Sequence, residues 1–129
     1  MRVDVSKPRP APVGIPSDRR RLGVAKRTPG ERLREALMAL SDFRGQVLAH
    51  DEKAWASITF SGARHTLGIL FAGAEAVEAG ERFIAALPDH EFAIPGQLVA
   101  DAAIIEVEHR LIPNPRLAVR CELLLLEDS

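Results

Sequence analysis

Residues 59–67, with the sequence TFSGARHTL, place Ser61, Arg64 and His65 within five positions of one another. A serine hydroxyl that donates to an imidazole is the usual arrangement for nucleophilic catalysis, with histidine as the base. That chemistry requires the two side chains to lie on the same face of the local structure. The expected backbone conformation therefore decides whether this stretch is a candidate site.

Apolar stretches with alternating polarity flank this segment and predict a β-hairpin. A type II′ turn favours glycine at its first central position, so Gly62 and Ala63 are the expected two-residue loop. In this register Phe60 opposes His65 on the apolar face, while Ser61 and Arg64 lie on the other face. We therefore expect a histidine at the core boundary, and His65 stays a candidate catalytic residue only if the turn is irregular.

Asp101 is the second residue that could do chemistry. Strand alternation places it on the apolar face with Val99 and Ile105, where a carboxylate needs a partner or a raised pKa. If the register continues, Asp101 opposes Glu127, and the two acids could share a proton or a metal. The alternative, which we favour, is that the strand begins near Ala102 and Asp101 is solvated.

Two further features are explained by structural roles without any chemistry. Residues 88–91, PDHE, offer three metal-capable side chains but lack HxxxH or CxxC spacing, so we expect a polar connection after a helix. Cys121 lies between Val119 and Leu123 on the expected inner face, where cysteine behaves as a small hydrophobic residue. G-x-S-x-G, P-loop and G-x-G-x-x-G motifs are absent from the sequence. We therefore expect no metal and no cofactor, and we favour a non-enzymatic protein while leaving an enzyme open.

Two helices are expected to position these residues. Thr28, Pro29 and Glu31 form a capping box with proline at the first helical position, and a leucine stripe follows until Gly45. A second helix is expected over residues 74–87, ended by Pro88. Glycine within a helix lowers its stability, so Gly80 indicates a close contact between this helix and the sheet.

The last part of the chain predicts a second hairpin, with residues 113–115 as its loop. In this register Glu108 opposes Arg120, a favourable cross-strand pair. Residues 46–50 are expected to form a short additional strand, followed by a polar turn over residues 51–53. With this strand in parentheses, the element order becomes α-(β)-β-β-α-β-β. This order predicts an α+β fold, a two-layer sandwich in which two helices cover one face of a mainly antiparallel sheet of four or five strands.

Composition limits the class of protein. The 129 residues are 47% apolar and 27% charged, which suits one folded domain over residues 29–129 after an N-terminal arm over residues 1–28. The longest C-terminal apolar run, residues 123–126, is too short to cross a membrane. A single cysteine fits a reducing compartment, so we expect a cytoplasmic protein with no membrane partner.

The net charge of −1 conceals an asymmetry. Residues 1–29 carry eight basic and two acidic side chains, and the remaining residues carry nine basic and 16 acidic ones. A basic, proline-rich arm could bind nucleic acid, although it has no aromatic side chain to stack a base. Because the arm also contains apolar residues, we favour its packing on the body or on a neighbouring chain.

A surplus of apolar residues is the most informative feature of the sequence. Alternation places several of them on the face of the sheet opposite the helices, where something should cover them. The expected interface residues are Trp55, Leu70, Ile104, Leu124 and Leu126. We therefore expect a homodimeric, non-enzymatic binding protein that self-associates through its sheet. An unknown protein partner, an enzyme or small-ligand binder with a polar site at the dimer interface, and a nucleic-acid-binding arm remain the alternatives.

Overall fold

A four-stranded antiparallel sheet and two helices make up the computed structural model, which describes residues 27–128. In chain order the elements are α2 (Pro29–Leu40), β1 (Gln46–Ala56), β2 (Ser61–Ala72), α3 (Ala74–Ala86), the short 3₁₀ helix η1 (Leu87–Asp89), β3 (Gln97–Arg110) and β4 (Arg116–Glu127). The strands lie in the order β1-β2-β4-β3. The predicted α+β fold and its element order are confirmed. The predicted arm, apart from its last two residues, lies outside the described residues.

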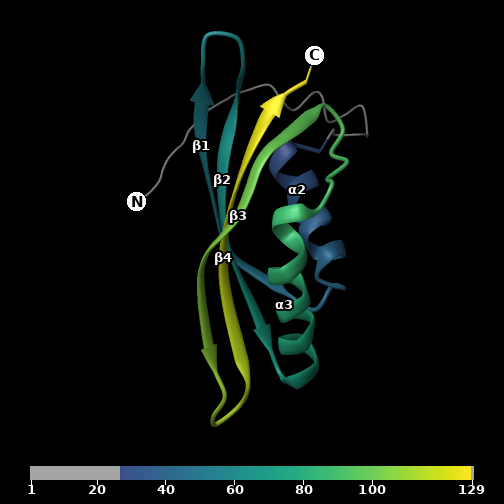
Figure 1. Cartoon of the computed structure of the whole chain (residues 1–129), viewed down its shortest axis with the longest axis vertical. Helices are drawn as coiled ribbons and strands as arrows, with labels where there is room; N and C mark the ends of the chain where they lie inside the picture. The colour runs from purple at the N-terminus through teal and green to yellow at the C-terminus, as the bar shows by residue number, and fades with distance from the viewer. Residues whose placement is uncertain (1–26, 129) are drawn as a thin grey trace, which may run out of the picture.

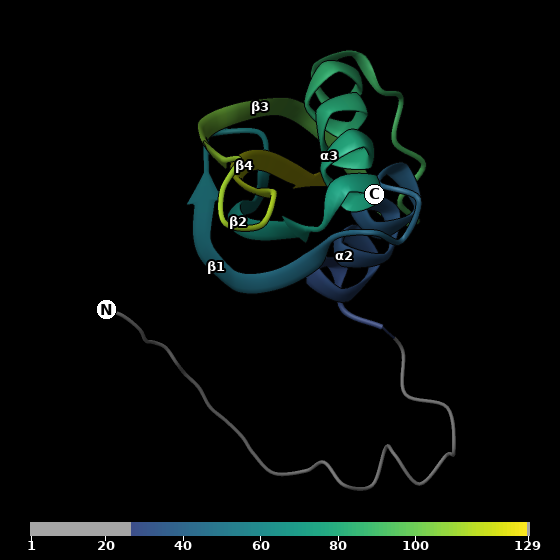
Figure 2. The ribbon, with the colours of Figure 1, turned by 90° about the horizontal axis from the view of Figure 1, so that it is seen from below.

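Both helices lie on the same side of the sheet (Figure 1). The view from below shows α2 and α3 side by side against the strands, with β1 curving towards α2 (Figure 2). The core lies between the two layers and includes Leu33, Leu37, Phe71, Phe83 and Leu123, all fully buried. We call the sheet face that carries this core the inner face and the opposite face the outer face. The two hairpins extend beyond the helices at opposite ends of the sheet (Figure 1).

Helix α2 begins as the sequence predicts. The Thr28 hydroxyl accepts from the backbone N–H of Glu31, and the Glu31 carboxylate accepts from the backbone N–H of Thr28. The helix ends at Leu40, earlier than the expected stop at Gly45. The reason is that Asp42 and Phe43 both adopt a φ of 57°, a left-handed conformation that no helix can continue. Phe43 is consequently 75% exposed and does not extend the apolar stripe.

Helix α3 packs closely on the sheet at Gly80. A Cβ atom at this position would lie 2.7 Å from Leu117 Cδ2 and 2.8 Å from Phe71 Cδ2. A larger residue would push the helix away from the strands, because both atoms belong to fully buried side chains. The close contact that Gly80 predicted is therefore present. The helix then passes into η1 at Leu87, so Pro88 follows its end as expected.

The loop of the first hairpin differs from the predicted one. It spans residues 57–60, and Gly62 lies within β2, directly opposite Trp55 of β1. The Ser57 hydroxyl accepts from the backbone N–H of Phe60, and the Ser57 N–H donates to the Phe60 carbonyl. This serine-based turn places His65 opposite Glu52, so the predicted pairing of Phe60 with His65 is wrong.

Gly62 has a role other than turning the chain. A Cβ atom built on it would overlap the carbonyl oxygen of Leu125 and lie 2.8 Å from the Cα of Leu126. Its φ is not positive, so the expected positive-φ turn is also wrong. Glycine is needed here because the backbones of β2 and β4 approach too closely for a side chain.

The second hairpin also turns earlier than predicted. Its loop spans residues 111–115, and the last opposing residues are Arg110 and Arg116. Leu117 therefore opposes His109 instead of Leu111. The ion pair of Arg120 is made with Glu106, at 2.9 Å, and the predicted pair with Glu108 is wrong.

Two β-bulges in β3 change which side chains face the core. The ladder shifts between Val99 and Asp101 and again between Ile104 and Glu106. Each bulge adds one residue to β3, so the alternation of faces reverses at each. Ile104 consequently packs against the core on the inner face. The prediction that Ile104 belongs to the outer face is wrong for this reason.

Candidate functional site

Two histidines from neighbouring strands meet beneath the start of α2. His50 of β1 and His65 of β2 lie on the inner face, with 2.9 Å between Nε2 of His50 and Nδ1 of His65. Arg34 of α2 donates from Nε to Nδ1 of His50 at 2.8 Å. Glu52, opposite His65 in the ladder, places Oε1 4.0 Å from Nδ1 of His65. We call Arg34, His50, Glu52 and His65 the histidine cluster.

The hydrogen bonds define the protonation of both rings. Because Arg34 can only donate, Nδ1 of His50 carries a lone pair and its proton is on Nε2. That proton is donated to Nδ1 of His65, which places the His65 proton on Nε2. His65 is 1% exposed, and its Nε2 has no hydrogen-bond partner among the described residues. The chain of donors thus runs from Arg34 inwards and ends at a buried N–H group.

Burial keeps both rings neutral. It lowers the pKa of His50 to about 4, with further lowering by the neighbouring His65 and by the Arg34 guanidinium, against a smaller opposing effect of Asp51. Burial likewise lowers the pKa of His65, and Glu52 opposes this shift. A proton on either ring would have to break a hydrogen bond of the cluster, because each Nδ1 is an acceptor. The neutral, hydrogen-bonded pair is therefore the form present at neutral pH.

A hollow of about 290 Å³ lies above the cluster. It is lined by Thr28, Gly30, Glu31, Arg34, His50 and Glu52. A Cβ atom at Gly30 would lie 3.2 Å from Cε1 of His50, so the first turn of α2 rests directly on the imidazole ring. The two glutamates offset the arginine, which gives the hollow no excess of positive charge for an anion.

The cluster is poorly arranged for base or metal chemistry. Both nitrogens of His50 already take part in hydrogen bonds, and Nδ1 of His65 accepts the proton of His50. A general base needs a free lone pair within reach of a substrate, and a metal ligand needs one directed at the ion. Across residues 27–128 no three His, Cys, Asp or Glu side chains are grouped to hold a metal ion. The arrangement instead favours a structural role, in which the two imidazole rings stay neutral and form a buried hydrogen bond.

The residues of the opening sequence motif separate in the structure. His65 lies on the inner face, as predicted, whereas Ser61 donates its hydroxyl to Glu127 at 3.2 Å. Arg64 lies on the outer face, with its guanidinium 3.6 Å from the Glu122 carboxylate. No Ser–His pair forms between these residues. The faces of Arg64 and His65 were predicted correctly, because both follow from the alternation of β2. The face of Ser61 was predicted wrongly, because β2 already begins at Ser61 and this residue therefore shares the inner face with His65.

Asp101 does not lie on the apolar face. It is exposed and opposes Leu124 on the outer face, while Glu127 opposes Gln97. The bulge beside Asp101 moved its side chain outwards, so the two acids do not meet. Asp101 is therefore solvated, as the favoured alternative predicted, although it lies within β3.

The other candidate residues, His90 and Cys121, lie in ordinary structural environments. His90, just after η1, is exposed and packs edge-on against Phe92, with 4.5 Å between ring centroids. Cys121 is fully buried, and burial raises the pKa of its thiol to about 12, which leaves it unreactive. Neither residue joins the histidine cluster.

The predicted interface residues occupy different environments. Trp55, Leu124 and Leu126 lie on the outer face near the β1–β2 loop, where Leu124 and Leu126 are buried and Trp55 is half-buried. Leu70 also lies on the outer face, near the β3–β4 loop. Leu98, 52% exposed, opposes Leu126 and extends the apolar group at the first end. We call Trp55, Leu98, Leu124 and Leu126 the apolar end of the outer face.

Sequence reasoning missed His50, Glu52 and Arg34. It ended a short strand at His50 and treated the following DEK as a turn, whereas β1 continues through these residues to Ala56. An edge strand tolerates such charges because one of its sides faces water. Extending the alternation through the polar residues would have placed His50 and Glu52 on the face of His65.

Comparison with protein-family models, with curated proteins and with solved structures found no match to this chain. Among the helices of residues 27–128, none has the length and apolar content needed to cross a membrane.

Proposed function

We propose that this chain is a small, non-enzymatic binding protein that acts as a homodimer, with the apolar end of the outer face as the contact between copies. The observation that carries the proposal is that both helices lie on the inner face, so no element of residues 27–128 covers the outer face (Figure 1). A sheet with apolar side chains on both faces is normally covered on both. A reducing compartment, the cytoplasm, is part of this proposal.

The charge of the outer face favours a second copy over a strongly charged partner. Among the outer-face residues that have a ladder partner, five are acidic and five are basic. They are Asp51, Asp101, Glu106, Glu108, Glu122, Lys53, Arg64, Arg110, Arg116 and Arg120. A face without net charge does not repel its own copy, and a two-fold dimer pairs the same surface on both subunits.

The apolar end supplies the hydrophobic part of such a contact. Leu98 is 52% exposed in the single chain, and Trp55 in the same row of the ladder is half-buried. Ile58 and Phe60 in the adjacent loop are also exposed. Large aromatic and aliphatic side chains that are available at one end of a face are the usual anchors of interfaces.

The oligomeric state of the full chain tests the proposal. Light scattering after size-exclusion chromatography at micromolar concentration should give twice the chain mass. Leu98→Glu should weaken association at least roughly tenfold, because it places a charge in the contact. Leu98 is the better position than Leu124, which is already buried and whose change would disturb the fold.

Ile112→Glu is the matched control, because Ile112 is 78% exposed at the opposite hairpin and should leave the dimer intact. Circular dichroism and melting of both variants verify that they fold. A native monomer would contradict the proposal. A dimer that survives Leu98→Glu would show that the contact lies on another surface.

The histidine cluster does not support an enzymatic activity as a second proposed function. His65 is buried and Asp101 lies on the other face, while residues 88–91 comprise the last two residues of η1 and the two that follow it. A polar site that joins these candidates would need two copies to bring them together. Nucleic-acid binding through the basic arm depends on residues outside the described part of the chain and stays a prediction.

A further inference from the structure

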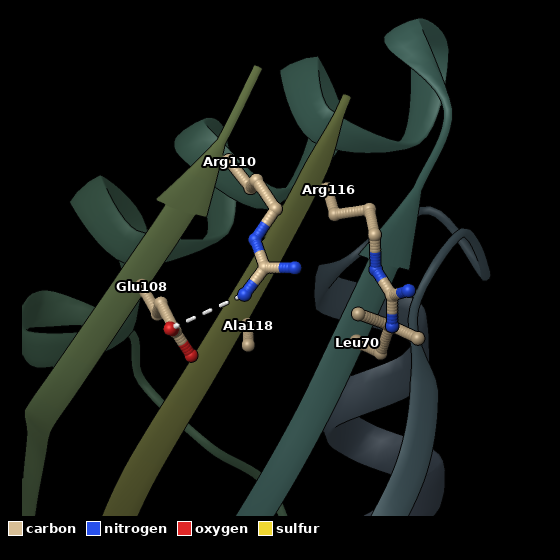
Figure 3. A pocket seen from close by; sticks show the side chains of 5 residues that line it. All are labelled: Leu70, Glu108, Arg110, Arg116 and Ala118. Atoms are coloured by element: carbon tan, nitrogen blue, oxygen red, sulfur yellow. Dashed lines mark ion pairs between the residues drawn. The ribbon is translucent and has the colours of Figure 1, made fainter. Parts of the chain in front are cut away.

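Two arginines oppose each other at the end of the β3–β4 ladder. Arg110 and Arg116 are direct partners on the outer face, and Figure 3 shows the Arg110 guanidinium next to Ala118 and the Arg116 guanidinium next to Leu70. Like charges directly opposite in a sheet destabilise it. Arginine cannot relieve this by losing a proton, because its pKa stays above about 12.

The charge at this position is incompletely neutralised within the described residues. Arg120 has Glu106 at 2.9 Å and Arg64 has Glu122 at 3.6 Å, so each of the other outer-face arginines has its own carboxylate. Arg110 has Glu108 at 3.9 Å, whereas Arg116 has no ion pair with any residue of 27–128. Two guanidinium groups and one carboxylate leave one positive charge without a counter-charge.

A small hollow lies at the two arginines. A hollow of about 140 Å³ is lined by Leu70, Glu108, Arg110, Arg116 and Ala118. Drug-sized ligands need roughly 300–1,000 Å³, so this hollow takes one functional group with a short tail. In Figure 3 the Leu70 side chain lies beside the Arg116 guanidinium, which gives the hollow an apolar wall next to its positive groups.

We propose that Arg110 and Arg116 form a binding site for the carboxylate of a short aliphatic acid. One carboxylate supplies the single missing negative charge, whereas a phosphate dianion would leave an excess. Guanidinium groups bind carboxylates through paired N–H donors, and Leu70 and Ala118 contact the alkyl part. The same group could be a free acid or a glutamate side chain of another protein. The site does not depend on self-association, because the apolar end lies at the opposite end of the sheet.

Titration with sodium butyrate tests the proposal. Backbone and arginine N–H resonances are followed by NMR while sodium chloride keeps the ionic strength constant. We expect saturable shifts at residues 70, 108–110 and 116–118, with a dissociation constant in the millimolar range. Butyramide, which has the same size without the charge, should give no saturable shift.

Variants separate a site from general surface attraction. Arg116→Gln should weaken butyrate binding at least roughly tenfold, since it removes one donor pair. Arg120→Gln should leave the binding unchanged, because Arg120 already pairs with Glu106. Shifts that do not saturate below roughly 50 mM, or that persist in Arg116→Gln, would overturn the proposal.

A capped peptide with one glutamate identifies the source of the acid. Tighter binding of the peptide than of butyrate assigns a protein carboxylate, and equal or weaker binding assigns a free acid. Light scattering of the Arg116→Gln variant keeps this test separate from the proposed dimer. That variant should remain a dimer even though it no longer binds butyrate.

Discussion

The histidine cluster and the arginine pair show two ways to place basic side chains together on adjacent strands. Nε2 of His50 lies 2.9 Å from Nδ1 of His65 on the inner face, and Arg110 and Arg116 oppose each other on the outer face. Histidine can lose its proton, so burial removes the charge and converts the repulsion into a hydrogen bond. Arginine keeps its charge, so the exposed pair needs water or an anion instead. The position in the fold thus determines which basic residue is tolerated.

The largest expected effect comes from replacing a buried histidine of the cluster with a basic residue that keeps its charge more readily. His65→Lys places a cation that is harder to neutralise at a position that is 1% exposed, where Glu52, at 4.0 Å, is the one carboxylate of residues 27–128 within ion-pair distance. We expect a loss of about 3–5 kcal/mol in the free energy of unfolding, measured by urea denaturation at neutral pH.

His65→Met is the matched control. It keeps the side-chain volume and removes the buried N–H group that lacks a partner, but it leaves Nε2 of His50 without its acceptor. The expected cost is about 1–2 kcal/mol. Similar losses in the two variants would mean that packing at this position matters more than charge.

Acid should weaken the fold through the histidine cluster. The folded-state pKa of His50 is about 4, below its ordinary value of 6.5, so the unfolded chain binds the proton first as the pH falls. The contribution is therefore complete above about pH 7 and is lost as the pH falls from about 6.5 towards 4. Because His50 is partly exposed, we expect a loss of about 1–2 kcal/mol in the free energy of unfolding between pH 7 and pH 5.

The double variant His50→Gln with His65→Met lacks the titrating groups and should show a flatter profile over the same range. Denaturation at several pH values, at constant ionic strength, compares the two proteins. If the unaltered chain is equally stable at pH 5 and pH 7, the rings do not stay neutral in the folded state.

The smallest effect is expected at the arginine pair. Arg116→Glu replaces opposing like charges by an opposite pair with Arg110 and should raise the free energy of unfolding by about 0.2–1 kcal/mol. Arg120→Glu should lower it by a similar amount, because it breaks the pair with Glu106. Melting curves at low ionic strength should therefore shift in opposite directions. Shifts in the same direction would show that local ion pairs do not govern this face.

The sequence was sufficient for the helices and the order of the elements. Capping at Thr28 and Glu31 and the close contact at Gly80 are local signals, and each acts within a few residues or against one neighbouring layer. The inward position of His65 was also predictable, because strand alternation is local as well.

The loops and the cluster depended on information that alternation does not carry. Gly62 serves a close approach of β4, a strand more than 50 residues later, but its sequence context is that of a turn. His50 became visible as a site residue only when β1 was extended through the charged residues 51–53. The bulges in β3 leave no signal in polarity alone, and for that reason alternation assigns Ile104 to the wrong face. Alternation would do the same for Asp101, which is solvated as the favoured alternative predicted.

The two bulges of β3 have a consequence for how this chain can change length. Each inserted residue reverses the alternation, so the two together restore it, and Val99 and Val107 both face inwards as in an uninterrupted strand. Deleting only one of them would turn one end of β3 inside out and expose core side chains. Deleting both would move only the short middle segment. Descendants of a common ancestor should therefore gain or lose residues in this strand in pairs.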